Sequence, residues 1–297
     1  MKKPISVVMF LFGLILSISC SSNKAYHSES DKSTVCIGTF NLEWLGDGIG
    51  DKKPRSSADY EKYAEIIANS GMEVIGVQEV ENSSAIKKIM KYLPDYKYIL
   101  GKKGSIQNVG LIYKNTIQVE SLGEYTPLKV EPERTRPGLI VKCKKGNFDW
   151  VIMVVHLKST SRYDDTPEKR QESFDYRKEQ AEVLSNWVDS IVDSDNEHDV
   201  FIVGDFNDNP RRDDKVIAPL SYNSNIVFLT WDMQSCKNKM WDMIDHIVIS
   251  KSVKNRYLDG SVHAYDFFST LTDKAAEGIS DHCPVMAVFD VTAEDND

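Results

Sequence analysis

Side chains that bind metal ions or move protons stand beside short apolar runs at six places in the chain, after the run at four of them and before it at two. Glu79 stands in VQEVEN, His156 in VVHLKS and His282 in SDHCPV. The other three motifs are TFNLEW with Asn41 and Glu43, GDFND with Asp205 and Asn207, and IDHIVIS with Asp245. Carboxylates, amides and histidines gathered around one substrate supply the positioning and charge neutralisation that phosphoryl transfer needs.

Each motif also has a structural interpretation when it is taken alone. GDFND can be a strand followed by an Asn/Asp turn, VVHLKS can hold a buried histidine, and SDH can cap a helix or strand. The occurrence of all six in one chain, with Asp281 beside His282, favours a functional site. The remaining histidines, His27, His198 and His263, are predicted to be surface residues.

The apolar runs beside these motifs predict β-strands that alternate with a few helices. The predicted strands cover residues 35–40, 72–77, 96–100, 108–114, 138–143, 150–157, 199–206, 246–250 and 284–291. Apolar residues at helical spacing predict helices over 57–70, 84–93 and 177–192. The polar stretch 158–176 is predicted to be a long connection. Strands that end in polar residues are expected to place those residues on one rim of a sheet.

The amino-acid composition excludes several classes of protein. The 297 residues are 41% hydrophobic and 27% charged, which excludes disorder and coiled coil for the chain as a whole. The formal net charge of −9 excludes a general polyanion binder, so any nucleic acid or phospholipid must be handled at a local site, with a metal. Without an internal repeat or composition break, residues 34–292 are predicted to form one domain, followed by an acidic tail at 293–297.

The first twenty residues resemble a bacterial lipoprotein signal. Lys2 and Lys3 precede an apolar run that is too short to span a membrane as a stable helix, and Cys20 follows. We expect a signal peptide over 1–19, lipidation of Cys20 and a polar tether over 20–33. A membrane anchor is the alternative. The protein is thus expected to be exported and lipid-anchored to the cell envelope, touching the membrane only through the lipid.

Cysteine is too sparse for a disulfide scaffold. Four cysteines follow the signal: Cys36, Cys143, Cys236 and Cys283. Three of them lie in or beside apolar strand-like runs, which favours buried thiols over disulfide bridges, although any pairing is beyond what the sequence determines.

The six motifs, in this order, resemble the DNase I-like endonuclease/exonuclease/phosphatase superfamily, and within it the branch of membrane and secreted nucleases. The resemblance spans about residues 35–291. It implies an α+β fold, a four-layer α/β/β/α sandwich of two packed mixed sheets with outer helices. It also implies hydrolysis of phosphate esters with a divalent metal, Mg²⁺ or Mn²⁺.

The resemblance assigns the metal to acidic side chains. Glu79 is expected to be its principal ligand, with Asn41 and Glu43 beside it. Asp281 is expected to hold the same ion or a second one. Oxygen ligands of this kind suit a hard cation that keeps several waters.

The resemblance assigns the proton transfers to the histidines. His282, oriented by Asp245, is expected to deprotonate the attacking water, while Asp205 and Asn207 position the nucleophile and a phosphate oxygen. Whether His282 or Asp205 takes the proton stays open. His156 is expected to stabilise the phosphate or protonate the leaving oxygen.

Within the superfamily, the motifs favour a nuclease. An abasic-site endonuclease would carry Pro-Asn in place of His156, and an inositol-polyphosphate phosphatase would carry Arg in place of His246. A sphingomyelinase-type enzyme would present apolar loops where this chain has a charged one.

Arg136 and Lys158 are expected to contact substrate phosphate. The prediction is a monomeric nuclease of broad specificity without sequence preference, with DNA as the expected substrate and RNA as a second one. A lipid or sugar-phosphate phosphodiesterase or phosphatase and a catalytically silent binding module are the alternatives.

Overall fold

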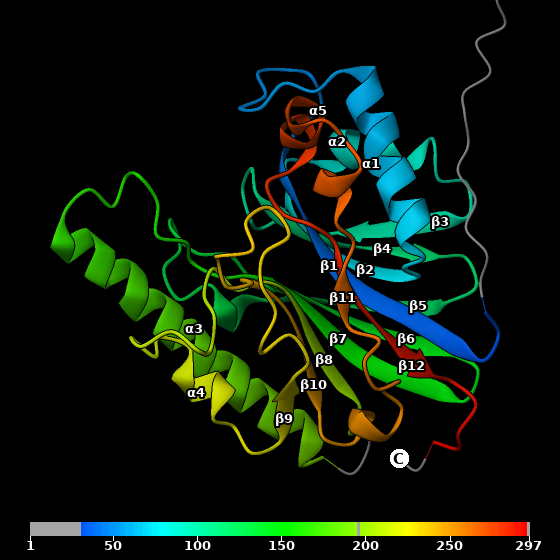
Figure 1. Cartoon of the computed structure of the whole chain (residues 1–297). Coiled ribbons are helices and arrows are strands. Elements are labelled where there is room, and N and C mark those ends of the chain that lie inside the picture. The colour runs from blue at the N-terminus through cyan, green and yellow to red at the C-terminus, as the bar shows by residue number, and fades with distance from the viewer. Residues whose placement is uncertain (1–30, 195–196, 296–297) are drawn as a thin grey trace, which may run out of the picture.

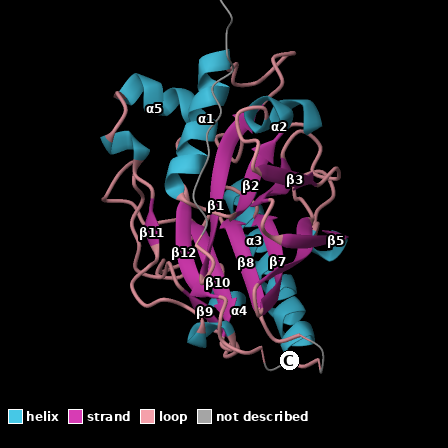
Figure 2. Ribbon diagram, turned by 90° about the vertical axis from the view of Figure 1, so that its right-hand side faces the viewer, coloured by secondary structure: helices cyan, strands magenta, loops and turns pink. Residues whose placement is uncertain are grey.

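Two six-stranded mixed sheets pack face to face, with helices on both outer faces (Figures 1 and 2). The computed structural model describes residues 31–194 and 197–295. The first sheet has the order β11 (His263–Ala264), β12 (Val285–Asp290), β1 (Thr34–Leu45), β2 (Val74–Val80), β4 (Asn108–Lys114) and β3 (Tyr96–Leu100). The second has the order β5 (Gln118–Tyr125), β6 (Gly138–Lys145), β7 (Phe148–His156), β8 (Val200–Asp205), β10 (Asp245–Ser250) and β9 (Ile226–Phe228). The expected four-layer sandwich is confirmed.

Three helices cover the first sheet and two cover the second (Figure 1). They are α1 (Ser57–Ser70), α2 (Ser83–Met90) and α5 (Asp273–Ile279) on the first sheet, and α3 (Pro167–Val192) and α4 (Ala218–Ser221) on the second. Short 3₁₀ helices lie at Thr126–Leu128, Val253–Asn255 and Phe267–Ser269.

The central strands are apolar on both faces because each face is covered. In β7, Ile152 and Val154 belong to the core between the sheets, whereas Met153 and Val155 pack against α3. Successive side chains of a strand point to opposite faces, so a strand buried on both sides has a nearly continuous apolar sequence. This is why the central strands were predictable from the sequence.

Two predictions about secondary structure need correction. The helix predicted over 177–192 begins at Pro167, with Thr166 as its N-cap, so half of the expected connection 158–176 is helical. Its first turns are polar because they project past the sheet, which removes the apolar periodicity. Strands β5 and β11 carry no apolar run, and the apolar run of β9 is only three residues long, so these strands were not predicted.

The prediction of a buried thiol was wrong for Cys283. Cys236 and Cys283 form a disulfide, while Cys36 and Cys143 are free thiols. The loop that follows β9 folds back over the start of β12 and brings together two residues 47 positions apart. Such long-range contact leaves no local pattern in the sequence.

The predicted signal peptide, Cys20 and most of the tether lie outside the described residues. Within the described part of the chain, no helix combines the length and the apolar character needed to cross a membrane. At the other terminus, residues 293–295 are held by Arg256, which donates hydrogen bonds to the carbonyls of Ala293 and Glu294.

Candidate active site

The predicted site residues converge at one end of the two sheets. β7 and β8 run parallel and pair His156 with Asp205, while antiparallel β10 places Asp245 on the other side of Asp205. Asn41 and Glu79 come from β1 and β2 of the other sheet. The expectation of a rim of one sheet is therefore corrected: the site lies where the ends of both sheets meet.

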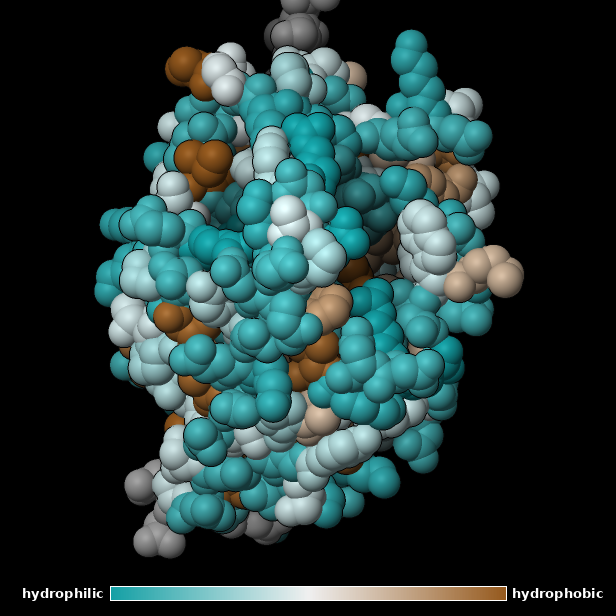
Figure 3. All heavy atoms as spheres, turned by 90° about the vertical axis from the view of Figure 1, so that its left-hand side faces the viewer, coloured by the Kyte–Doolittle hydropathy of each residue, from teal (hydrophilic) through white to brown (hydrophobic). Residues whose placement is uncertain are grey.

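A cavity of about 620 Å³ opens at this end of the molecule. The predicted residues that line it are Glu43, Glu79, Arg136, His156, Asp205, Asn207, Asp281 and His282. Figure 3 views the molecule from the side of these strand ends, and the surface there is predominantly hydrophilic and hollowed. Asn41 and Asp245 are buried directly behind lining residues, to which they are hydrogen-bonded.

Two carboxylates, Glu79 and Asp205, form the floor of the cavity, and the Asn41 amide lies directly behind them. The Asn41 side-chain amide donates to Glu79 Oε1 at 3.2 Å and to Asp205 Oδ2 at 3.0 Å. His156 Nε2 lies 3.8 Å from the same Glu79 oxygen and 3.6 Å from the same Asp205 oxygen. Burial, with the charge of Asp245 and Glu79 added, raises the pKa of Asp205 against the opposing effect of His282. Buried carboxylates this close carry an excess of negative charge.

That donor set fits a divalent cation. Glu79, His156 and Asp205 offer ligand atoms that lie within 4.8 Å of one another, and so do Asp205, Asp245 and His282. Hard cations such as Mg²⁺ and Mn²⁺ prefer carboxylate and amide oxygens. A cation would also reduce the repulsion among the carboxylates, which contributes to the raised pKa of Asp205.

His282 is held by a carboxylate. Its Nδ1 lies 2.7 Å from Asp245 Oδ2, and its Nε2 faces Asp205 and Asp281 at 3.9 and 3.7 Å. Burial acts to lower the pKa of His282, but the charge and hydrogen bond of Asp245 outweigh it and raise that pKa well above the ordinary value. An imidazole fixed in this way has one nitrogen left for proton transfer.

The pKa of His156 is shifted in the opposite direction from that of His282. Burial, together with the positive charges of Arg136 and His282, holds the pKa of His156 well below its ordinary value. Its Nδ1 is buried and has no hydrogen-bond partner among the residues that the structure describes. A neutral imidazole donates through one nitrogen only, so His156 serves as a positioned hydrogen-bond donor.

Glu43 and Asp281 are placed apart from the carboxylate floor. The Glu43 carboxylate binds Lys53 Nζ at 2.5 Å and accepts from the Asp281 backbone N–H at 2.8 Å. Glu43 thus fastens the segment before His282 to the loop after β1. The side chain of Asp281 is 45% exposed, which leaves it open to the cavity.

Of the residues expected to bind substrate phosphate, the structure brings only Arg136 into the cavity. Arg136 is hydrogen-bonded to Gln107, and both line it. Lys158 is buried, with its Nζ 3.7 Å from Asp164 Oδ2, and is absent from the lining. Helix α3 accounts for this, because Arg177 and Gln180 bind the Lys158 backbone and turn its side chain inward.

The backbone is unusual at the same end. Glu43, Trp44, Glu79 and Asn207 adopt positive φ values of 41°, 54°, 60° and 52°. Residues other than glycine rarely adopt positive φ values, and backbone strain of this kind is concentrated at functional sites. Asn207 is held there because its backbone N–H donates to Asp205 Oδ1 and its side chain to the Leu157 carbonyl.

Several lining residues were not predicted. Trp44 reaches the cavity from the end of β1, and Lys52, Lys53, Gln107 and Tyr163 reach it from loops. Of these residues, Trp44 alone stands in one of the six motifs, TFNLEW, where its aromatic side chain follows Asn41 and Glu43. The others depend on the course of the loops, which apolar periodicity does not report.

Fold and site together define a metal-dependent hydrolase of phosphate esters. The sequence matches the profile of the Endonuclease/Exonuclease/phosphatase family over residues 59–274, so the chain belongs to this family. The family consists of phosphodiesterases and phosphatases that depend on a divalent metal. No match was found among curated proteins.

Solved structures share the fold at low identity. D. rerio TDP2 complexed with single strand DNA product has 15% identity and a TM-score of 0.63, over 86% of this chain and 99% of that one. Mannosyl-6-phosphatase Bt3783 of Bacteroides thetaiotaomicron has 16% identity and a TM-score of 0.58, over 85% and 98%. The catalytic domain of human Nocturnin has 16% identity and a TM-score of 0.58, over 86% and 94%.

Proposed function

We propose that the protein is a nuclease of broad specificity that hydrolyses phosphodiester bonds of DNA and RNA with Mg²⁺ or Mn²⁺. The observation that carries this proposal is the cationic and aromatic wall of the catalytic cavity. Lys52 Nζ lies 3.3 Å from the centre of the Trp44 ring, and the Arg162 guanidinium lies 5.1 Å from the Tyr163 ring. Cations that contact phosphates and rings that stack on bases bind a polynucleotide without reading its sequence.

The residues of the site divide the reaction among them. When bound, a divalent cation would neutralise the phosphate charge. Glu79, Asn41 and Asp205 would hold it, and Asp281, which lies apart from the carboxylate floor, would hold a second ion. Asp245 fixes His282 through Nδ1, which leaves Nε2 to accept the proton of the attacking water.

Two further groups of the cavity would hold the phosphate. Arg136 brings a positive charge to it, and neutral His156 donates a hydrogen bond through Nε2. Replacing His282 and Asp205 in turn decides which of them accepts the proton.

We propose further that a lipid on Cys20 tethers a monomeric protein to the cell envelope, and that it acts outside the cytoplasm. The apolar run before Cys20 supports export. The Cys236–Cys283 disulfide is independent support, because disulfides persist in oxidising compartments and are rare in the cytosol. Globomycin treatment of the producing cells and palmitate labelling test this proposal; an unlabelled Cys20→Ser variant is the expected control.

The test of the activity uses the full-length chain and linear DNA and RNA. Release of acid-soluble nucleotides that requires Mg²⁺ or Mn²⁺, stops with EDTA and is lost in His282→Ala supports the proposal. Release of phosphate from mannose 6-phosphate or another monoester, with both nucleic acids intact, assigns the protein to the phosphatases. A folded protein that binds Mn²⁺ no better than Glu79→Ala supports a silent binding module.

A further inference from the structure

A second hollow lies on the far side of the catalytic histidine from the main cavity. Its volume is about 180 Å³, and it shares Asp281 and His282 with the main cavity. Asp245, which orients His282, also lines it. The two hollows therefore meet at His282, the residue proposed to accept the proton of the attacking water, and at Asp281.

The outer wall of this hollow carries groups that suit a nucleotide. Trp241 is 57% exposed, Lys237 is exposed and the Arg212 side chain is 41% exposed. An exposed indole stacks on an unpaired base, and the cations contact the flanking phosphates. The acid on the wall, Asp242, binds Arg211 at 2.5 Å, which offsets its charge.

The platform that presents Trp241 is fixed to the active site. Cys236 is joined by the disulfide to Cys283, the residue next to His282. The Ser235 N–H donates to the Trp241 carbonyl at 2.9 Å, and a β-bridge links Gln234 with Asp242. The wall is thus a short, closed hairpin that is covalently tethered next to His282.

Similar groups continue on the opposite side of the main cavity. A third hollow of about 340 Å³ shares Trp44, Gln107 and Arg136 with it and adds Lys103 and Lys129. Cationic and aromatic side chains therefore flank the catalytic centre in both directions. A site that trims strand ends, or removes a terminal phosphate, needs them on one side only.

We propose that Trp241, Lys237 and Arg212 bind the nucleotide beyond the scissile bond, so that the protein cleaves internal bonds of an unpaired strand. This inference rests on the proposed nuclease function. In the reaction, water oxygen bonds to phosphorus as one of the P–O bonds to the flanking sugars breaks. The leaving oxygen takes up a proton, and the second proton of water ends on solvent. One fragment keeps the phosphate and the other gains a hydroxyl.

The test compares circular single-stranded DNA, which has no ends, with bis(p-nitrophenyl) phosphate, a diester too small to reach the second hollow. The full-length wild type is compared with Trp241→Ala/Lys237→Ala. The matched control is Tyr222→Ala/Lys254→Ala, which removes an exposed ring and an exposed cation outside the hollows. Trp241→Phe keeps a ring and should restore most of the loss.

The wild type is expected to open the circle. The Trp241→Ala/Lys237→Ala variant should raise KM for the circle about tenfold or more, with bis(p-nitrophenyl) phosphate hydrolysis unchanged. A wild type that degrades linear strands but leaves circles intact overturns the inference, and so does a variant with unchanged KM. Hydrolysis of bis(p-nitrophenyl) phosphate without any cleavage of linear DNA or RNA overturns the nuclease proposal itself.

Discussion

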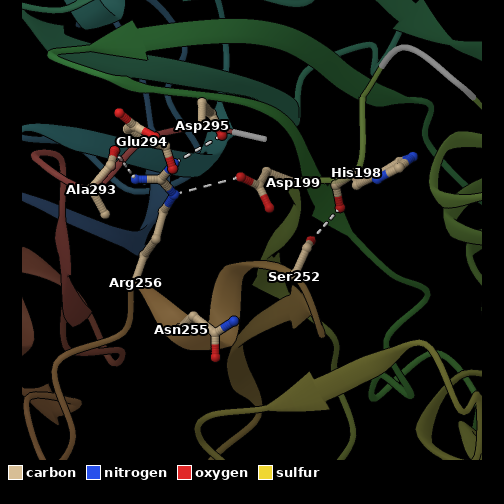
Figure 4. A pocket seen from close by; sticks show the side chains of 8 residues that line it. All are labelled: His198, Asp199, Ser252, Asn255, Arg256, Ala293, Glu294 and Asp295. Atoms are coloured by element: carbon tan, nitrogen blue, oxygen red, sulfur yellow. Dashed lines mark hydrogen bonds and ion pairs between the residues drawn. The ribbon is translucent and has the colours of Figure 1, made fainter. Parts of the chain in front are cut away.

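The two ends of β8 carry charged pockets of opposite character. Asp199, just before the strand, binds Arg256 in a pocket of about 260 Å³ near the C-terminus (Figure 4). Arg256 is also bound by Asp295 at 2.8 Å and by two backbone carbonyls, so its charge is balanced. Asp205, at the end of the strand, faces other carboxylates and two histidines.

The two ends of β8 differ in whether their buried polar atoms have hydrogen-bond partners. Two of the five buried side-chain atoms without a partner among the described residues are His156 Nδ1 and Asp245 Oδ1, both at the active site. Positive φ values also gather there, and none occurs among the residues lining the Arg256 pocket. The Arg256 end stabilises the fold, whereas the Asp205 end holds a polar arrangement ready for an ion and a substrate, at a cost in stability.

The largest expected effect is that of Glu79→Gln. This change removes the charge but keeps the shape, so we expect kcat to fall about a thousandfold, equivalent to about 4 kcal/mol, with the fold retained. Glu120→Gln, an exposed acid on β5, is the matched control. Steady-state kinetics and Mn²⁺ titration measure the effect, and equal Mn²⁺ affinity in both variants would remove Glu79 from the metal site.

At the other end of β8, Arg256→Met should act on stability alone. Removing one member of a buried charged cluster leaves Asp199 and Asp295 without their cation, at a cost of about 3 kcal/mol in the free energy of unfolding. Urea denaturation measures this loss. We expect kcat of the folded variant to equal that of the wild type; a large fall in kcat would mean that the two ends are coupled.

Asp245→Asn sharpens the contrast within the active site. The variant loses the charge that raises the pKa of His282, so the acid limb of the pH–rate profile should move to lower pH. A misoriented imidazole should also lower kcat about a hundredfold. An unshifted acid limb in kcat measured from pH 5 to 9 would assign proton acceptance to another group.

The smallest effect concerns His246, buried beside the active site. Its Nε2 donates to the Asp208 carbonyl and its Nδ1 accepts from Thr230, and burial lowers its pKa to about 4. The unfolded chain binds the proton more readily, so stability falls as pH falls below the ordinary value of 6.5. Between pH 7 and pH 5 we expect a loss of about 2 kcal/mol. In His246→Asn, urea denaturation at both pH values should no longer give this difference.

The elements around the site were largely predictable, since their signals are local. Helix α1 has the predicted bounds because Ser56 caps one end and Gly71, at φ 74°, closes the other. Strand β4 also has the predicted bounds, and apolar runs ending in Asn41, His156 and Asp205 pointed to the correct end of the sandwich.

What escaped prediction depends on long-range contact. Lys158 carries the charge expected of a phosphate ligand, but Arg177 on α3 holds its backbone and directs its side chain inward. Glu43 lies in the expected motif, but its carboxylate forms an ion pair with Lys53. The disulfide and the Trp241 platform depend on how a loop folds back, which no periodicity encodes.

The most direct test of the proposed nuclease is a substrate comparison with the full-length chain and Mn²⁺. The two substrates are an oligonucleotide without terminal phosphates and mannose 6-phosphate, a monoester. The cationic and aromatic cavity wall predicts cleavage of the oligonucleotide with a kcat/KM about a hundredfold or more above that for the monoester. Release of phosphate from mannose 6-phosphate while the oligonucleotide stays intact would contradict the account.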